Sequence, residues 1–291
     1  MLCETEDDLR STGKGISKLM GRVIGTALLV LVGFGGNAAD EFAVIPSGLF
    51  KMGDTDKNAP EHYVNVGMYR IGTMEVSKAE WDDVYTWALN NGYTFSNPGS
   101  GKGANHPVQT VSWYDCVKWC NARSEKEGLK PCYLAYNANG LGVYKQGIVD
   151  LTSAFVDWSA TGYRLPTEAE WEKAARGGLD SKTYAWGDAI PSHAIANCVI
   201  LADGEGYHES YRSSGMPYTC AVYAYGQQVY GYGLYNVCGN VMEWCWDWYG
   251  EYQPSAADNP AVNPRGPASG FQRIVRGGSW ESDASRCGVA Y

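Results

Sequence analysis

Nine cysteines and four histidines are the residues of this 291-residue chain with the most versatile chemistry. Thiolates and imidazoles bind zinc or iron when they recur at short, fixed spacings. Here the histidines form no His-Glu-x-x-His motif and no close pair, and the chain has no Cys-x-x-Cys. The sequence therefore gives little support for a zinc or iron site. The four histidines are His62, His106, His193 and His208.

Eight of the cysteines lie beyond residue 38. In an exported chain of this size they permit disulfides without requiring them. Cys116 and Cys120 have the i, i+4 spacing of a helix, which is awkward for pairing with each other. Disulfides and buried free thiols both remain open, and the aromatic composition favours free thiols. The eight are Cys116, Cys120, Cys132, Cys198, Cys220, Cys238, Cys245 and Cys287.

Phosphate-binding and nucleic-acid-binding chemistry find no support. No Gly-x-x-x-x-Gly-Lys-Ser/Thr or Gly-x-Gly-x-x-Gly motif is present, and residues 231–236 miss the second pattern at its sixth position. The 23 basic and 32 acidic side chains give a net charge of −9. A nucleic-acid-binding protein usually carries a basic surface, so we expect no nucleic-acid partner.

The composition describes the scaffold that must position any site. Charged residues make up only 19%, glycines number 36, and 21 Tyr and 11 Trp stand against 6 Phe. Abundant aromatic residues argue against a disordered chain, and abundant glycine argues against a helical bundle. We expect one α+β domain with few short helices, many short strands and long structured loops, in which Tyr and Trp bury their rings and satisfy their polar ends.

Three helices have clear start signals. Ser77 with Glu80 and Ser112 with Asp115 form capping boxes, which predict helices to about Leu89 and to about Lys126. A third helix is predicted from residue 167, and the glycines at 177–178 end it. Strands are predicted over 42–52, with a turn inside, over 64–71, and as short strands with a hairpin in 132–156. Residues 91–107 are predicted to be loop.

The N-terminus resembles a targeting segment. Residues 1–38 place basic residues ahead of an apolar stretch, 23–34, and small residues follow at 36–39, which is the order of a secretory signal peptide. An uncleaved N-terminal membrane anchor is the alternative, and Met1 and Met20 are both candidate starts. We therefore expect an exported protein of the cell surface, outer membrane or periplasm, which meets the membrane only through this segment and carries one domain over 39–291.

The central part of the chain carries a specific resemblance. Gly162-Tyr163-Arg164-Leu165-Pro166-Thr167-Glu168-Ala169-Glu170-Trp171-Glu172, continued by 174–178, resembles the formylglycine-generating-enzyme (sulfatase-modifying-factor) family. The resemblance covers about 42–291 and implies the C-type-lectin-like fold of that family. We expect Arg164 to pair with an acid of the following helix, and Gly277-Gly278 to allow a close backbone approach. Further matching motifs lie at 52–53, 75–77, 106–108, 111–113, 184–188, 239–244 and 276–280.

The resemblance also implies calcium, although no cofactor is expected to be required. Backbone carbonyls, an amide and a carboxylate are hard oxygen donors of the kind that Ca²⁺ prefers. In the alternative, Asn240 and Glu243 only satisfy the backbone of a turn. The candidate ligands are Cys238, Gly239, Asn240, Val241 and Glu243, with Asn197 and Cys198 as part of a second family site.

The family's oxidase chemistry uses two cysteines five residues apart that bind copper. The matching positions here are Ser282 and Cys287. A hydroxyl does not replace a thiolate as a ligand of Cu(I), so we expect no catalytic residue and no enzyme activity. The iron-binding histidine cluster of the sulfoxide-synthase branch is also missing. A copper-dependent formylglycine-generating oxidase, or another enzymatic member, remains the alternative.

The C-terminal residues, about 273–291, resemble the variable region of diversity-generating-retroelement proteins. Such a region alternates fixed small or apolar residues with polar ones that adenine-directed mutagenesis reaches. Loops on a rigid scaffold often carry recognition, and Tyr, Ser, Asp and Arg suit a binding surface. We expect a protein or glycan on another cell's surface as the ligand, with Trp246 and Trp248 as possible neighbours; a plain non-catalytic member is the alternative. The predicted ligand-binding residues are Trp280, Glu281, Ser282, Asp283, Ser285, Arg286, Gly288 and Tyr291.

The family pattern usually continues beyond the position of Tyr291. Beyond that position the family pattern continues with an Arg-Asn stretch and ends in a Gly-Phe-Arg strand. We therefore expect either that the sequence is a fragment or that the family's last strand is missing from it.

Overall fold

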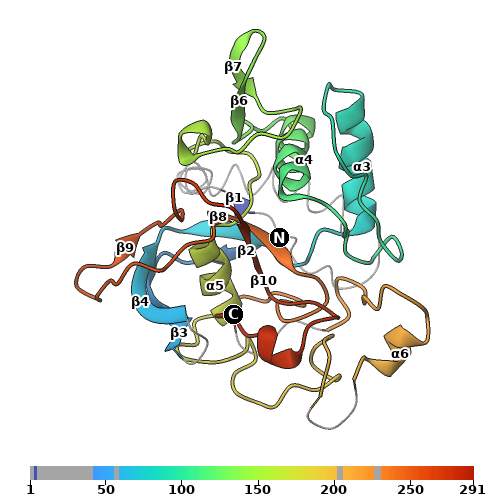
Figure 1. The fold of residues 1–291 in the computed structure, drawn as a ribbon, viewed down its shortest axis with the longest axis vertical. Helices are drawn as coiled ribbons and strands as arrows, with labels where there is room; N and C mark the ends of the chain where they lie inside the picture. The colour runs from blue at the N-terminus through green and yellow to red at the C-terminus, as the bar shows by residue number, and fades with distance from the viewer. Residues whose placement is uncertain (1–2, 5–41, 56–58, 202–205, 226–230) are drawn as a thin grey trace, which may run out of the picture.

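A computed structural model describes residues 3–4, 42–55, 59–201, 206–225 and 231–291. Most of the predicted targeting segment, 1–38, lies outside these residues. Within the described part of the chain, no helix is both long and apolar enough to cross a bilayer. The architecture is α+β, with few short helices, small separate sheets and long loops, as predicted (Figure 1).

Two small sheets form the N-terminal part of the domain. In the first, β5 (Tyr69–Gly72) lies between β1 (Cys3–Glu4) and β2 (Phe42–Ile45). In the second, β4 (Ala59–Val66) lies between antiparallel β3 (Gly48–Asp54) and parallel β9 (Ala261–Val262). The predicted strand pair in 42–52 is confirmed. The prediction of a single strand over 64–71 is wrong. β4 ends at Val66, and after Gly67 and Met68 the chain enters the other sheet as β5.

All three predicted helices are present with the predicted caps. They are α3 (Lys78–Leu89), α4 (Trp113–Lys126) and α5 (Glu168–Arg176). Each begins with a capping box, and α5 ends at Gly177 in the left-handed conformation that favours glycine. The predicted hairpin is also confirmed as β6 (Leu134–Asn137) and β7 (Gly140–Val143). The short elements that complete the described fold are 3-10 turns at Ser153–Phe155 and Ala284–Arg286, α6 (Glu209–Arg212), β8 (Glu243–Trp248) and β10 (Arg273–Arg276).

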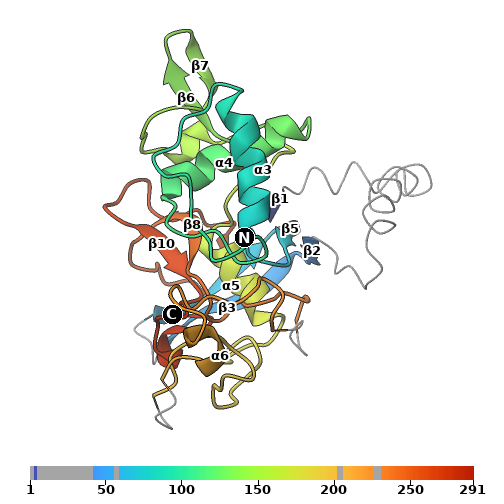
Figure 2. The same cartoon turned by 90° about the vertical axis from the view of Figure 1, so that its right-hand side faces the viewer.

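The hairpin and α6 lie at opposite ends of the molecule. In both views β6 and β7 project beyond α3 and α4, whereas α6 and the 3-10 turn Ala284–Arg286 lie toward the other end (Figures 1 and 2). Antiparallel β8 and β10 run between these ends. The C-terminal segment is therefore far from the projecting hairpin.

Aromatic rings fill much of the core, and their polar groups are bonded. Trp113 donates to the carbonyl of Cys245 over 2.9 Å, Trp171 donates to Glu243 over 3.0 Å, and the hydroxyl of Tyr133 accepts from the backbone of Leu165 over 2.8 Å. The prediction that Tyr and Trp bury rings while satisfying their polar ends is thus confirmed.

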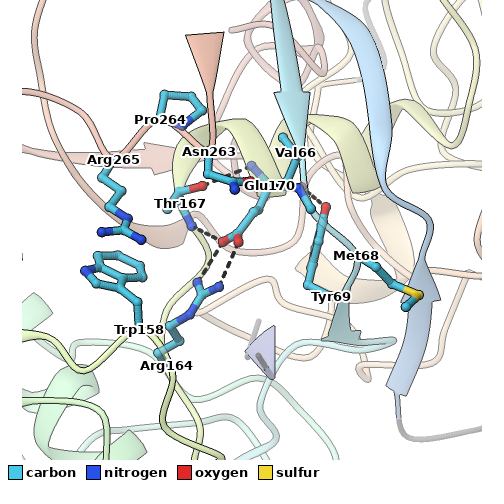
Figure 3. Close-up of a pocket in the computed structure, with 11 residues that line it drawn as sticks. Val66, Met68, Tyr69, Trp158, Arg164, Thr167, Glu170, Asn263, Pro264 and Arg265 are labelled. Carbon is cyan, nitrogen blue, oxygen red and sulfur yellow. Dashed lines mark hydrogen bonds and ion pairs between the residues drawn. The ribbon is translucent and has the colours of Figure 1, made fainter. Parts of the chain in front are cut away.

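The predicted ion pair of Arg164 with an acid of the following helix fixes the start of α5. The two terminal guanidinium nitrogens of Arg164 each lie 2.7 Å from a carboxylate oxygen of Glu170 (Figure 3). The same carboxylate accepts from the backbone of Thr167 over 2.7 Å and so completes the capping box. Burial alone would raise the pKa of Glu170, but the charge and hydrogen bonds of Arg164 outweigh it and lower that pKa. One buried ion pair thus joins the loop before α5 to its first turn.

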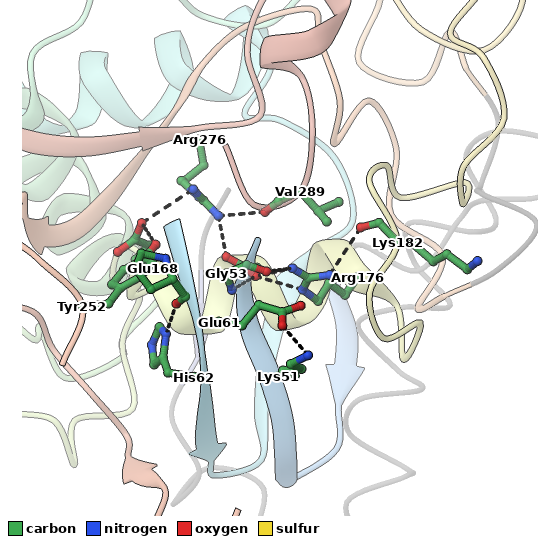
Figure 4. Close-up of polar contacts among 12 residues, drawn as sticks. Lys51, Gly53, Glu61, His62, Glu168, Arg176, Lys182, Tyr252, Arg276 and Val289 are labelled. Carbon is green, nitrogen blue, oxygen red and sulfur yellow. Dashed lines mark hydrogen bonds and ion pairs between the residues drawn. The ribbon is translucent and has the colours of Figure 1, made fainter. Parts of the chain in front are cut away.

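A second buried network joins α5 to β3, which comes early in the domain sequence, and to β10, which comes late in it (Figure 4). Glu172 of α5 accepts from Gly53 of β3 over 2.8 Å and from Arg276 of β10 over 2.6 Å. Arg276 also donates to the carbonyl of Val289 over 2.7 Å. The C-terminal segment is therefore anchored to the core by a guanidinium that is itself held by α5.

Candidate ligand-binding site

Trp280 marks the start of the predicted binding segment, and its ring is mostly buried. It is 8% exposed and packs against Tyr218, at 5.0 Å between ring centroids, and Tyr207, at 5.9 Å. Its backbone N–H donates to the carbonyl of Asn240 over 2.9 Å. In this position Trp280 supports the segment beside α6 and offers little of its own surface to a ligand.

The following residues divide into exposed and supporting side chains. Ser282 lies partly buried, and its hydroxyl accepts from the backbone of Ser279 over 3.0 Å. Asp283 caps the 3-10 turn by accepting from the backbone of Ser285 over 2.9 Å. Both side chains therefore shape the segment. The predicted binding residues whose side chains face solvent are Glu281, Ser285, Arg286 and Tyr291.

Glycines make the close contacts beneath this segment. A Cβ on Gly277 would lie 2.8 Å from the carbonyl oxygen of Val237, and one on Gly278 would lie 2.6 Å from the sulfur of Cys287. Both have positive φ angles, of 88° and 69°. The predicted close approach at 277–278 is confirmed. A Cβ on Gly288 would lie 3.0 Å from the carbonyl oxygen of Thr183, so this buried residue also belongs to the frame.

The two positions that match the family's copper cysteines face different surroundings. Ser282 bonds within its own turn, as described above. Cys287 is fully buried, its thiol donates to the carbonyl of Asp283 over 3.7 Å, and it belongs to the same hydrophobic cluster as Cys198. The described cysteines beyond residue 38 are free thiols in this structure, and seven of them are buried.

A large groove, which no sequence motif indicated, adjoins the end of the segment. It encloses about 1160 Å³ and is bordered by Tyr291, by β10 and by aromatic side chains of β8 and the loops beside it. Arg273 of β10 stands between the rings of Trp113 and Trp248, at 3.7 and 3.6 Å from their centroids. The rings that border the groove are Trp113, Tyr114, Trp244, Trp248, Tyr249, Tyr252, Phe271 and Tyr291.

Of the two neighbouring tryptophans considered from the sequence, one borders this groove. Trp248 lines it, whereas Trp246 is 2% exposed and stacks on Tyr133 in the core. A smaller pocket of about 170 Å³ lies elsewhere, beside Arg164 (Figure 3). There the guanidinium of Arg265 lies 3.9 Å from the centroid of Trp158.

The predicted calcium segment, Cys238 to Glu243, forms a buried turn against Glu75. Asn240, with a positive φ of 60°, donates from its side chain to Glu75 over 2.8 Å, and its side-chain oxygen accepts from the backbone of Cys220 over 2.9 Å. Glu243 accepts from Trp171. The side chain of Asn240 therefore supports the turn, and its oxygen is already bonded.

Other oxygens beside this turn fit a hard cation. Glu75 is buried, and within the described chain neither its second carboxylate oxygen nor the side-chain oxygen of Asn236 has a hydrogen-bond donor. Burial, and then the charge of Glu243, raises the pKa of Glu75 to about 8. A buried carboxylate beside another needs a proton or a cation. The donors at this turn, including the carbonyls of Cys238, Gly239 and Val241, are of the type that suits Ca²⁺.

No group of three or more His, Cys, Asp or Glu within the described residues has metal-binding geometry. A cation at this turn would therefore depend on amide and carbonyl oxygens. Sequence reasoning missed Glu75 and Asn236, which lie 161 residues apart and meet only in the fold. Their family motifs at 75–77 and just before residue 239 were the available signal.

The second proposed calcium pair is engaged in protein contacts. The side-chain amide of Asn197 donates to the carbonyl of Tyr218 over 2.9 Å, and its backbone carbonyl accepts from Asn240 over 2.8 Å. The carbonyl of Cys198 lies 3.1 Å from the Nε2 atom of His193. Asn197 thus joins the turn at Cys238–Glu243, the predicted calcium segment, to the loop beneath Trp280.

Comparisons with known proteins agree with this fold. The model of the sulfatase-modifying factor enzyme 1-like domain matches residues 34–291. Chaperone protein LppX of Paenibacillus barcinonensis is 30% identical over 266 residues, which cover 87% of this chain and 83% of that protein. The formylglycine-generating enzyme of Thermomonospora curvata is 36% identical over 185 residues, 63% of this chain but only 47% of the enzyme.

A solved structure extends the comparison to the whole fold. Treponema denticola variable protein 1 superposes with a TM-score of 0.60 at 29% sequence identity, over 86% of this chain and 87% of that one. The family match over residues 34–291 includes the region that carries the candidate site.

Proposed function

Since this chain belongs to the family of sulfatase-modifying factor enzyme 1-like domains, we propose that it is a non-catalytic member that binds a ligand through its C-terminal segment. The ligand is a protein or glycan on another cell's surface, and the protein acts after export, at the cell surface, in the outer membrane or in the periplasm. The segment varies through a diversity-generating retroelement. The likeness to Treponema denticola variable protein 1 supports this assignment within the family.

One observation carries the proposal. Glu281, Ser285, Arg286 and Tyr291 point to solvent from a segment whose other residues are buried or bonded. Arg276 and the buried Trp280 hold that segment at its start, and Cys287 holds it near its end. Exposed side chains on a fixed frame can change without loss of the fold, which is what a diversified binding surface requires.

The oxidase alternative has less support. Two soft thiolates would have to meet to hold Cu(I), and Ser282 supplies a hydroxyl in place of one of them. The thiol of Cys287 is buried against Cys198. Incubation of the purified protein with a cysteine-containing sulfatase peptide, copper and oxygen tests this directly. We expect no aldehyde on the peptide; aldehyde formation would contradict a purely binding role.

We also propose a structural Ca²⁺ at the turn that contains Asn240. Glu75 and Asn236 supply side-chain oxygens, and the carbonyls of Cys238, Gly239 and Val241 complete the candidate set. The cation would neutralise a buried carboxylate. No cofactor is required for binding in this proposal, because the calcium turn lies beneath the surface that carries the exposed side chains.

A screen with a matched control tests the binding proposal. The protein is applied to a glycan array and to a panel of recombinant bacterial and host surface proteins. A variant with Glu281, Ser285, Arg286 and Tyr291 all changed to Ala should lose the binding that the parent shows. A control with Tyr136 and Leu141 changed to Ala alters exposed side chains of the distant hairpin and should keep it. Loss in the control with retention in the first variant would place the binding site elsewhere.

A further inference from the structure

Two thiols from distant parts of the chain meet beneath the C-terminal segment. Cys198 and Cys287 are both 0% exposed and belong to the same hydrophobic cluster. The thiol of Cys287 donates to the carbonyl of Asp283, and Asp283 is bridged to Val199, the neighbour of Cys198. Disulfide formation needs two sulfurs that approach without rearrangement of the backbone, so backbone pairing beside both cysteines favours it.

The backbone around the two cysteines is fixed in register. Val199, next to Cys198, forms a parallel bridge with Asp283. Its N–H donates to the carbonyl of Ser282 over 2.9 Å, and its carbonyl accepts from Ala284 over 3.0 Å. These bonds set the strand that carries Cys198 alongside the turn that leads to Cys287. The approach of the two thiols is thus a consequence of backbone pairing.

The position of the Cys287 sulfur is restricted further from two sides. Its thiol lies 3.7 Å from the carbonyl of Asp283, and a Cβ on Gly278 would come within 2.6 Å of the sulfur. Only a glycine at 278 leaves room for it. The sulfur therefore has little freedom to turn away from Cys198.

A third thiol, that of Cys238, lies in the same cluster but has another partner. It is hydrogen-bonded to the backbone of Ala185, and burial raises its pKa to about 12. Cys238 is therefore a natural internal control, because it shares the burial of the pair but not the backbone pairing of Val199 with Asp283.

We propose that Cys198 and Cys287 form a disulfide bond when the protein folds in the presence of a low-molecular-weight or protein disulfide. The thiolate of one cysteine attacks the oxidant's disulfide and releases one thiolate, which leaves a mixed disulfide. The thiolate of the other cysteine then attacks the first cysteine's sulfur in this mixed disulfide, which forms the Cys198–Cys287 bond, breaks the bond to the oxidant and releases the oxidant's second thiolate. The protein loses two electrons and two protons, and the oxidant's disulfide is reduced to two thiols.

We expect this thiol–disulfide exchange to take place during folding, before the C-terminal segment docks and buries the two cysteines. The neighbouring Cys198 side chain and then burial raise the pKa of Cys287, so its reactive thiolate is scarce once the segment has docked. The bond would close a loop that contains the calcium turn and the start of the binding segment. If the proposed binding role holds, this cross-link pre-organises the exposed residues, which lowers the entropic cost of binding.

Peptide mapping tests the proposal on the full chain. The protein is refolded with reduced and oxidised glutathione, its free thiols are alkylated, and it is digested and analysed by mass spectrometry without reduction. We expect one linked peptide pair that contains Cys198 and Cys287, and two fewer alkylated cysteines than in the reduced protein. Alkylation of both residues, or a bond from either one to Cys238, would overturn the proposal.

Matched variants separate the pair from its neighbour. Cys238→Ala should keep the linked peptide, whereas Cys198→Ala and Cys287→Ala should lose it. Oxidation should raise the Tm of the parent and of Cys238→Ala by roughly 10 °C, and an unchanged Tm in both would count against the bond. If the other two variants fail to fold, the map of the parent protein still decides. The map does not depend on any ligand, so failure of the binding proposal leaves this result readable.

Discussion

At the scale of single residues, the C-terminal segment separates positions that can change from positions that cannot. Glu281, Ser285 and Arg286 face solvent, and their replacement disturbs no buried contact. Gly288 lies among them in sequence but is buried against Thr183. The sequence pattern placed Gly288 among the variable residues. An alternation of small and polar residues shows the type of each side chain, but it does not show which residues contact the core.

We therefore expect Gly288→Asn to destabilise the protein by about 1–3 kcal/mol, the usual cost of forcing atoms into a packed site. The added Cβ would press on the carbonyl of Thr183, which also accepts the N–H of Val289 over 2.9 Å. Ser285→Asn, the matched change at an exposed position, should stay within about 0.5 kcal/mol of the parent. Urea unfolding measures both, and equal stability of the two variants would refute the distinction.

At the scale of elements, α5 is the part on which the candidate site depends most. Its first turn holds Arg164 through Glu170, and its middle holds Arg276 through Glu172. The caps of α5 were predictable, because a capping box and a C-terminal glycine are local signals. Its partners in β3 and β10 were not, because they lie 119 and 104 residues away from Glu172 along the chain.

Removal of the Glu170 charge should leave the buried guanidinium of Arg164 without this carboxylate to balance its charge. We expect Glu170→Gln to cost about 3–5 kcal/mol at pH 7. The folded pKa of Glu170 is lowered from 4.5, so its contribution is present above that unfolded value and is lost as the pH falls through the folded one. The stability gap between parent and variant should therefore shrink below about pH 4.

Asp188→Asn supplies the control for this change. Asp188 pairs with Lys182 at the surface, where its side chain is 54% exposed. Loss of such a pair should cost at most about 1 kcal/mol. Denaturant unfolding of the three proteins across pH is the measurement. A gap for Glu170→Gln that stays constant down to pH 3 would show that the ion pair does not carry it.

At the scale of the whole molecule, the candidate site depends on segments that the sequence could assign to a family but could not place in contact. Motifs around Arg164, Asn240 and Trp280 predicted the fold class and the region of the site. The groove beside Tyr291 and the meeting of Glu75 with Asn236 arise from tertiary packing, so periodicity and local caps contain no information about them.

If Ca²⁺ binds where Glu75 meets Asn236, it should stabilise the whole domain. We expect the thermal midpoint to fall when EDTA is added to the purified protein, and to recover with excess Ca²⁺, because a ligand that binds only the folded state shifts the equilibrium toward it. Glu75→Gln should weaken the response to calcium. Arg212→Gln, at an exposed position of α6, should not. A midpoint that EDTA leaves unchanged would count against the site.

The claim that the C-terminal segment is a diversified binding surface has one direct test. The 3′ end of the coding sequence is read from many cells of the source population, together with the neighbouring DNA. We predict substitutions concentrated at the codons of Glu281, Ser285, Arg286 and Tyr291, with Gly278, Trp280, Cys287 and Gly288 unchanged, and a nearby near-copy that differs mainly at adenines beside a reverse transcriptase gene. An invariant segment with no such copy would contradict the account and leave a plain non-catalytic member of the family.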